Sequence, residues 1–197
     1  MSSIKLTADS GGGTFELKAP SSGSNARVLT VPDTASGTVL TTTNPKAGNI
    51  IQVVHVSFST ETSIASTSFT DTGLTATITP SSASNKILVI VSSNLQFSRG
   101  QVSASGGVRV RRVTGGVDTN IYEAGNSNPT LGNQLNGHGS GIFSRMNMAV
   151  NIEDSPNTTS SCVYRVQAAA ETTSNTGKVT AQEENTPSHM TLMEVAA

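Results

Sequence analysis

The chain has 197 residues and a mass of 20.2 kDa, which leaves room for one domain of about 150 residues and a short additional segment. Ser, Thr, Asn and Gly contribute 28, 27, 15 and 18 residues, whereas charged residues make up 13% and aromatic residues 4%, so strands and turns are favoured over helices. The formal net charge of −1 excludes the strongly basic proteins that bind nucleic acids or anionic membranes.

Two further classes of protein do not fit the sequence. The single cysteine, Cys162, allows no intrachain disulfide. The longest apolar run, Ile87–Val91, is far too short to span a bilayer, and residues 1–5 lack the apolar core of a signal peptide. We therefore expect a protein without membrane insertion and without a nucleic-acid partner.

Residues 1–47 form an N-terminal arm in which short apolar pulses alternate with turn-rich pieces, a pattern that predicts three or four short strands. Its few large apolar residues cannot offset the conformational entropy of ordering the segment by itself. We expect the arm to pack on copies of itself or on a larger assembly. The residues predicted to make these contacts are Ile4, Leu6, Phe15, Leu17, Val28, Val31, Val39 and Leu40.

Longer alternating runs begin after residue 47, so residues 48–197 are predicted to form a globular β domain. Ile50–Phe58 carries Val54, Val56 and Phe58 on one face. Leu74, Ala76 and Ile78 alternate with threonines until Pro80 ends the strand. Ile87–Val91 is apolar on both faces, which is typical of a central strand.

The second half of this domain continues the pattern. Thr114-Gly115-Gly116 predicts a hairpin turn between two strands. Later strands are expected around residues 142–152, 162–168, 178–182 and 190–195. The resulting eight or nine antiparallel strands predict a two-sheet β-sandwich of jelly-roll type.

One loop, residues 125–141, is longer than most connections in a compact domain. Loops of this length are either functional or simple solvated connectors, and both alternatives stay open. If the loop contacts a partner, its polar side chains can donate and accept hydrogen bonds from a rigid scaffold. The candidate contact residues are Asn126, Asn128, Asn133, Gln134, Asn136 and His138.

No motif in the sequence indicates catalysis, a cofactor or a metal. The three histidines, at positions 55, 138 and 189, are not framed by a nucleophile motif, and His55 is expected to face solvent or a subunit contact. Glu153-Asp154 and Glu183-Glu184 are interpreted as solvated strand ends, because neighbours in a strand point to opposite faces. We expect no catalytic residues, no metal site and no enzymatic activity.

The only basic cluster contains Arg109, Arg111 and Arg112. Because Arg109 and Arg111 share one strand face, they could bind a carboxylate or phosphate. Surface or intersubunit salt bridges are the alternative interpretation.

Several short motifs together resemble bacteriophage tail-fibre and other virion appendage proteins, especially those of marine phages. In the arm these are FELKAP (15–20), VLTVPD (28–33) and GTVLTT (37–42). In the β domain they are SFTDTGL (68–74), ITPSS (78–82), KILV (86–89) and LMEV (192–195). The resemblance covers nearly the whole chain, although it includes no shaft repeats and no coiled coil.

The resemblance implies a trimeric, non-enzymatic structural protein located on the virion. Residues 1–47 would anchor a short tail fibre or spike to other virion proteins, and residues 48–197 would present the sandwich to a host cell-surface receptor. A capsid decoration or neck protein with a purely structural role is the alternative.

Overall fold

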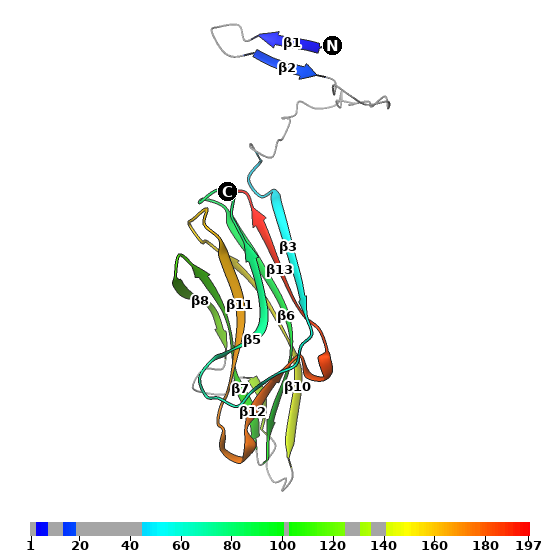
Figure 1. Ribbon diagram of the computed structural model, residues 1–197, viewed down its shortest axis with the longest axis vertical. Helices are drawn as coiled ribbons and strands as arrows, with labels where there is room; N and C mark the ends of the chain where they lie inside the picture. Colours follow the sequence, from blue (N-terminus) through cyan, green and yellow to red (C-terminus); the bar gives the residue numbers. More distant parts are fainter. Residues whose placement is uncertain (1–2, 8–13, 19–44, 101–102, 125–130, 135–140) are drawn as a thin grey trace. The chain divides into compact units, whose positions relative to one another are not determined.

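The computed structural model describes residues 3–7, 14–18, 45–100, 103–124, 131–134 and 141–197 (Figure 1). The chain divides into two units, residues 1–39 and 40–197, which are described separately. Within the described ranges, no helix has the length and apolar character needed to cross a membrane.

The first unit contains an antiparallel hairpin of β1 (Ser3–Thr7) and β2 (Thr14–Lys18). Its register places Ile4 opposite Leu17 and Leu6 opposite Phe15, so four of the predicted arm residues lie in paired strands. The other four, Val28, Val31, Val39 and Leu40, lie outside the described residues.

The second unit is a sandwich of two antiparallel sheets (Figure 1). The first sheet contains β3 (Ile50–Phe58), β13 (Ser188–Val195), β6 (Lys86–Arg99), β10 (Ile142–Asp154), β12 (Lys178–Ala181) and β4 (Thr62–Ile64). The second contains β5 (Thr70–Ile78), β11 (Cys162–Ala170), β7 (Ser103–Thr114), β8 (Val117–Ala124) and β9 (Leu131–Gln134). Two short 3-10 turns, η1 (Ser174–Thr176) and η2 (Glu183–Asn185), flank β12.

The strand order is that of a jelly roll. Among the long strands, the first sheet runs β3-β13-β6-β10 and the second runs β5-β11-β7-β8. Each sheet therefore alternates early and late strands of the chain, as two interlocked Greek keys require. This order confirms the predicted all-β fold and antiparallel sandwich.

The core lies between the sheets and follows the predicted alternation. Leu74, Ala76 and Ile78 of β5 are buried, and their threonine neighbours at 75 and 77 are exposed. Tyr164 and Val166 on the neighbouring strand β11 are fully buried. The Gly115-Gly116 hairpin is also confirmed, because both glycines have positive φ angles, +56° and +79°, between β7 and β8.

Strand β6 is central, as predicted, and it is longer than its apolar segment. Its first half pairs with β13 and its second half with β12, while β10 follows it from residue 87 to residue 99. The chain enters this unit beside the Lys86 end, where Gly48 donates its N–H to the carbonyl of Ala196 at 2.9 Å. With a rise of about 3.3 Å per residue, the Arg99 end lies about 43 Å away.

Two expectations about connections and strand ends were wrong. The structure forms β9 at residues 131–134, inside the segment expected to be one long loop, because this stretch pairs with residues 103–106 of β7. With β4, β9 brings the strands in the described part of this unit to eleven, more than the eight or nine expected. Glu183-Glu184 form the turn η2 and do not end a strand.

Candidate functional site

A buried ion pair joins the two sheets. Nη1 of Arg112 on β7 lies 2.6 Å from both carboxylate oxygens of Asp154 on β10. The hydroxyl of Tyr164 on β11 donates to Oδ2 of the same carboxylate at 2.7 Å. Burial raises the pKa of Tyr164, and the hydrogen bond to Asp154 raises it further, so the phenol stays a proton donor. The arrangement ties the sheets together and supplies the buried carboxylate with donors from two strands of the other sheet.

This ion pair corrects one prediction from the sequence. Asp154 was expected at a solvated strand end, yet it is only 9% exposed, while its neighbour Glu153 faces solvent. The two carboxylates point to opposite faces, as predicted. Asp154 is buried because the inner face of β10 ends against Arg112, which provides its counter-charge.

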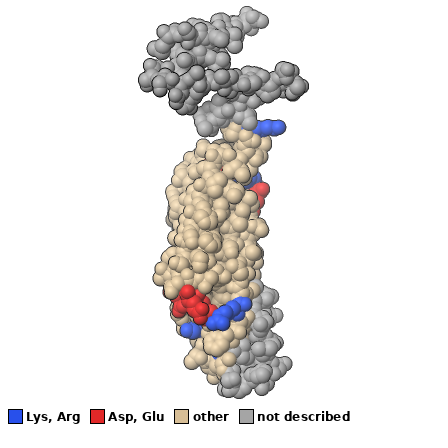
Figure 2. Space-filling view, turned by 90° about the vertical axis from the view of Figure 1, so that its right-hand side faces the viewer, with Lys and Arg blue, Asp and Glu red and all other residues tan. Residues whose placement is uncertain are grey.

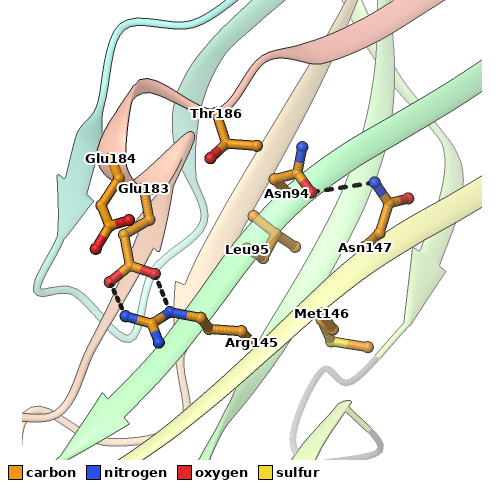
Figure 3. A pocket seen from close by; sticks show the side chains of 8 residues that line it. All are labelled: Asn94, Leu95, Arg145, Met146, Asn147, Glu183, Glu184 and Thr186. Atoms are coloured by element: carbon orange, nitrogen blue, oxygen red, sulfur yellow. Dashed lines mark hydrogen bonds and ion pairs between the residues drawn. The ribbon is translucent and has the colours of Figure 1, made fainter.

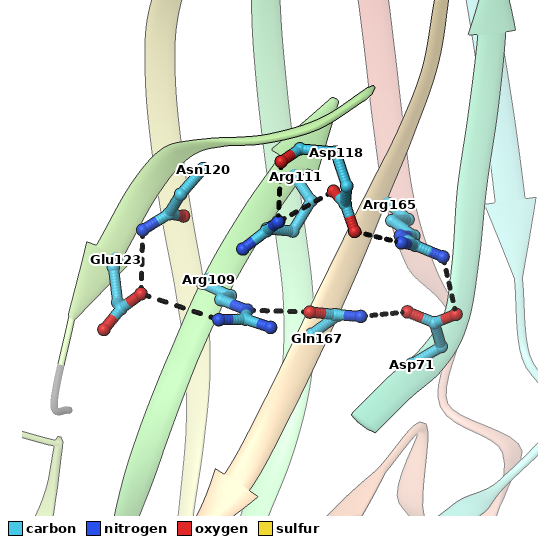
Figure 4. A network of polar contacts seen from close by, with 8 residues as sticks. All are labelled: Asp71, Arg109, Arg111, Asp118, Asn120, Glu123, Arg165 and Gln167. Carbon is cyan, nitrogen blue, oxygen red and sulfur yellow. Dashed lines mark hydrogen bonds and ion pairs between the residues drawn. The ribbon is translucent and has the colours of Figure 1, made fainter. Parts of the chain in front are cut away.

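The outer face of the second sheet carries a polar network of side chains from β5, β11, β7 and β8 (Figure 4). Asp118 binds Arg111 at 2.8 Å and Arg165 at 2.5 Å, and Arg165 also reaches Asp71 at 3.3 Å. The hydrogen bonds from Arg111 and Arg165 hold the pKa of Asp118 below its usual value, although burial alone would raise it. Three arginines and three carboxylates make up the charges of this network: Arg109, Arg111, Arg165, Asp71, Asp118 and Glu123.

This network decides between the two interpretations of the arginine cluster. Arg109 and Arg111 do share one strand face, as predicted. Arg109 donates from Nε to Gln167 at 2.7 Å, lies 3.9 Å from the Glu123 carboxylate and covers the ring of Phe69 at 4.3 Å. Their charges are therefore satisfied within the chain, which favours structural salt bridges over the capture of a separate anion.

The outer face of the first sheet differs from this network because much of it is uncharged. Figure 2 views the unit from the side on which β3 and β13 lie in Figure 1, and its charged side chains gather at the ends. Ile50 and Val53 of β3 are 57% and 54% exposed. Half-buried apolar side chains on β13 and β6 adjoin them: Leu88, Ile90, Met193 and Val195.

Two histidines lie in the middle of this face. His55 is exposed, as expected, and its ring stacks on that of His189 with centroids 5.5 Å apart and planes inclined by 20°. Its Nδ1 lies 2.9 Å from the hydroxyl of Thr191. In the described part of the chain, no cluster of three metal-ligating side chains occurs.

A polar pocket of about 300 Å³ lies farther along the same face, toward the Arg99 end of β6 (Figure 3). Arg145 donates two hydrogen bonds, of 2.6 and 3.1 Å, to the carboxylate of Glu183. These hydrogen bonds raise the pKa of Arg145 and lower the pKa of Glu183. Asn147 donates to the side-chain oxygen of Asn94 at 3.1 Å. Ion pairing thus neutralises the principal cation of this pocket.

A second hollow, of about 410 Å³, opens at the Arg99 end itself. Phe143, Ser98 and Lys178 lie directly opposite one another on β10, β6 and β12. Phe143 is 65% exposed, whereas Ser98 between the two larger side chains is buried. The rest of the described lining consists of Arg99 and three smaller residues, Gly100, Gly141 and Thr176.

The residues predicted for host contact are only partly described. Asn133 and Gln134 lie in β9, where Gln134 is opposite Ser103 at the start of β7. Asn126, Asn128, Asn136 and His138 lie outside the described residues. The sequence did not indicate the Phe143–Ser98–Lys178 row, because its members come from strands far apart in the chain.

No protein-family model and no curated protein matches this chain. Solved particle structures of infectious bursal disease virus are similar at 12% identity. The match to T=1 particles derived from the virus has a TM-score of 0.36 and covers 98% of this chain and 44% of that chain. The match to the Gt strain has a TM-score of 0.28 and covers 98% of this chain and 46% of that chain. The match to the T13 particle has a TM-score of 0.32 and covers 94% of this chain and 42% of that chain. This chain spans less than half the length of those chains.

Proposed function

We propose that the protein is a structural component of a bacteriophage virion. It forms a short trimeric tail fibre or spike, attached to the particle by residues 1–47 and presenting the jelly roll to the host surface. The observation that carries the proposal is that the two ends of the jelly roll differ. The chain enters beside Lys86, and the exposed Phe143 and the strand β9 lie toward the other end of β6 and β7, about 43 Å from Lys86.

The arm supports this proposal from the sequence side. Its motifs resemble those of virion appendage proteins, and the hairpin of β1 and β2 pairs Ile4 with Leu17 and Leu6 with Phe15. An isolated two-stranded hairpin is only marginally stable in water. Packing against other copies or other virion proteins would supply the missing stabilisation.

Association of copies is supported by the apolar outer face of the first sheet, whereas the number three comes from the resemblance to virion appendage proteins. Ile50 and Val53 are more than half exposed on a face whose middle is uncharged, so a second copy of the chain can cover it without burying a charge. The opposite outer face, by contrast, has six charges paired within the chain. We therefore assign the subunit contact to β3, β13 and the half of β6 that pairs with β13.

A capsid decoration or neck protein remains the second candidate. The polar network of the second sheet favours a decoration or neck protein. The charged side chains of this face are paired with one another, so they are not available to bind a receptor. A jelly roll also occurs in proteins with unrelated functions, so the fold alone does not separate the two candidates.

Particles assembled without this chain distinguish the candidates. If the protein is a fibre or spike, particles lacking it should stay intact and lose adsorption to host cells. If it is a decoration or neck protein, they should adsorb normally and lose resistance to heat or osmotic shock. Particles that are unchanged in both properties would contradict both candidates.

A further inference from the structure

The hollow at the Arg99 end is built from three strands whose side chains differ sharply in size. Ser98 forms its floor on β6, with Phe143 on one neighbouring strand and Lys178 on the other. Adjacent strands lie about 4.8 Å apart, so the backbones of Phe143 and Lys178 are about 10 Å apart. The longer side chains of Phe143 and Lys178 form the walls of the hollow on either side of the buried Ser98.

The hollow is positively charged, unlike the pocket beside it. Among the described residues, no carboxylate lines the hollow and Lys178 makes no hydrogen bond or ion pair within 4 Å, although at longer range its charge helps to lower the pKa of Glu183. In the neighbouring pocket, Arg145 is bound to Glu183. An acidic group that enters the hollow could therefore pair with the Lys178 ammonium group without first breaking an ion pair within the protein.

Phe143 adds an exposed aromatic face to this cation. A phenylalanine that is 65% exposed leaves a large apolar ring surface in water, and covering it is favourable. A ligand that contacts both walls has a ring with one apolar face and an acidic substituent. Sugar rings that carry a carboxylate or phosphate have this combination.

We propose that the Phe143–Ser98–Lys178 hollow binds an acidic sugar of a surface glycan, with the sugar ring against Phe143 and the acid group at Lys178. This inference rests on the proposed function for the biological source of the glycan, since the hollow lies at the end of β6 farthest from the entry of the chain. The binding itself depends only on the hollow.

The test measures binding to the full chain by NMR titration with four probes: trigalacturonate, glucose 1-phosphate, galactose and inorganic phosphate. We expect saturable binding of at least one acidic sugar and at least tenfold weaker binding of galactose and inorganic phosphate. Lys178→Gln should weaken the acidic sugar about tenfold, Phe143→Ala should do the same, and Lys178→Arg should largely retain binding. Lys46→Gln, which removes an equal charge from an exposed lysine near the chain entry, should change nothing.

Three results would overturn the inference: no saturable binding of either acidic sugar, equal binding of inorganic phosphate, or unchanged binding by Lys178→Gln. A cooperative melt of each variant shows that it is folded. Adsorption of particles carrying Lys178→Gln then separates the two proposals. Normal adsorption together with weakened sugar binding would support the hollow and contradict its use in host contact.

Discussion

The hydroxyl of Tyr164 lies 2.7 Å from Oδ2 of Asp154, and this hydrogen bond joins the second sheet of the jelly roll to the first. Arg112 completes the tie from the neighbouring strand. A carboxylate at 9% exposure needs such partners, because an unpaired buried charge is strongly destabilising. The sandwich is thus held by a polar contact as well as by its apolar core.

Tyr164→Phe should lower the free energy of unfolding by about 1–3 kcal/mol, because it removes one donor from the buried Asp154 carboxylate. Urea unfolding of the full chain at pH 7 measures the change. Tyr122→Phe is the matched control, since Tyr122 is only half-buried and makes no hydrogen bond through its hydroxyl to described residues. Equal losses in both variants would contradict a specific role for the Tyr164 hydroxyl.

Glu194→Gln should destabilise the protein at neutral pH and make it less sensitive to acid. Burial alone would raise the pKa of Glu194, but hydrogen bonds from Asn85, Ser81 and Gln52 outweigh it and lower the pKa below 4.5. A folded-state pKa below the unfolded value stabilises the protein above about pH 4.5, and this stabilisation is lost as the pH falls through the folded-state value.

The measurement for Glu194 is urea unfolding at pH 7 and pH 3. At pH 7 the variant should lose about 1–3 kcal/mol, because an amide cannot accept hydrogen bonds from all the donors that the carboxylate oxygens serve. At pH 3 the difference from the natural chain should shrink. A constant difference at both pH values would contradict the role assigned to the carboxylate charge.

Light scattering of the full chain should give the mass of a trimer. Val53→Asp should shift the protein toward monomers, because a charge on the apolar outer face would be buried in the subunit contact. Val117→Asp is the control, since Val117 is 63% exposed on β8 of the other sheet. A folded monomer from the unmodified chain would refute the trimer.

Residues 45–197 alone should fold with a cooperative melt and β-rich circular dichroism. This fragment retains the turn in which Asn49 donates to the carbonyl of Lys46 at 3.0 Å, and it retains the whole core between the sheets. An unfolded fragment would show that the jelly roll needs the arm for folding, against the predicted division of the chain.

The alternating apolar segments were sufficient to predict the sandwich. Leu74–Ile78 and Ile87–Val91 follow the two-residue period of strands with one or both faces covered, and Gly115-Gly116 specify the hairpin between β7 and β8. These signals are local in the sequence, so they could be read without knowing which strands pair.

The missed features depend on pairings between distant segments. Residues 92–99 of β6 include the buried polar residues Ser93, Gln96 and Ser98. They interrupt the alternation of apolar residues by which a strand is predicted. The burial of Asp154 depends on Arg112, 42 residues away, and the hollow at Phe143 depends on β12. No spacing in the sequence brings these residues together.

A cryo-EM map of the intact phage particle tests the central claim most directly. We expect three copies of the jelly roll around a threefold axis on a tail fibre or spike, with residues 1–47 in contact with another virion protein and the Phe143 end directed outward. A purified particle whose map and peptide content both lack this chain would contradict the assignment of the protein to the virion.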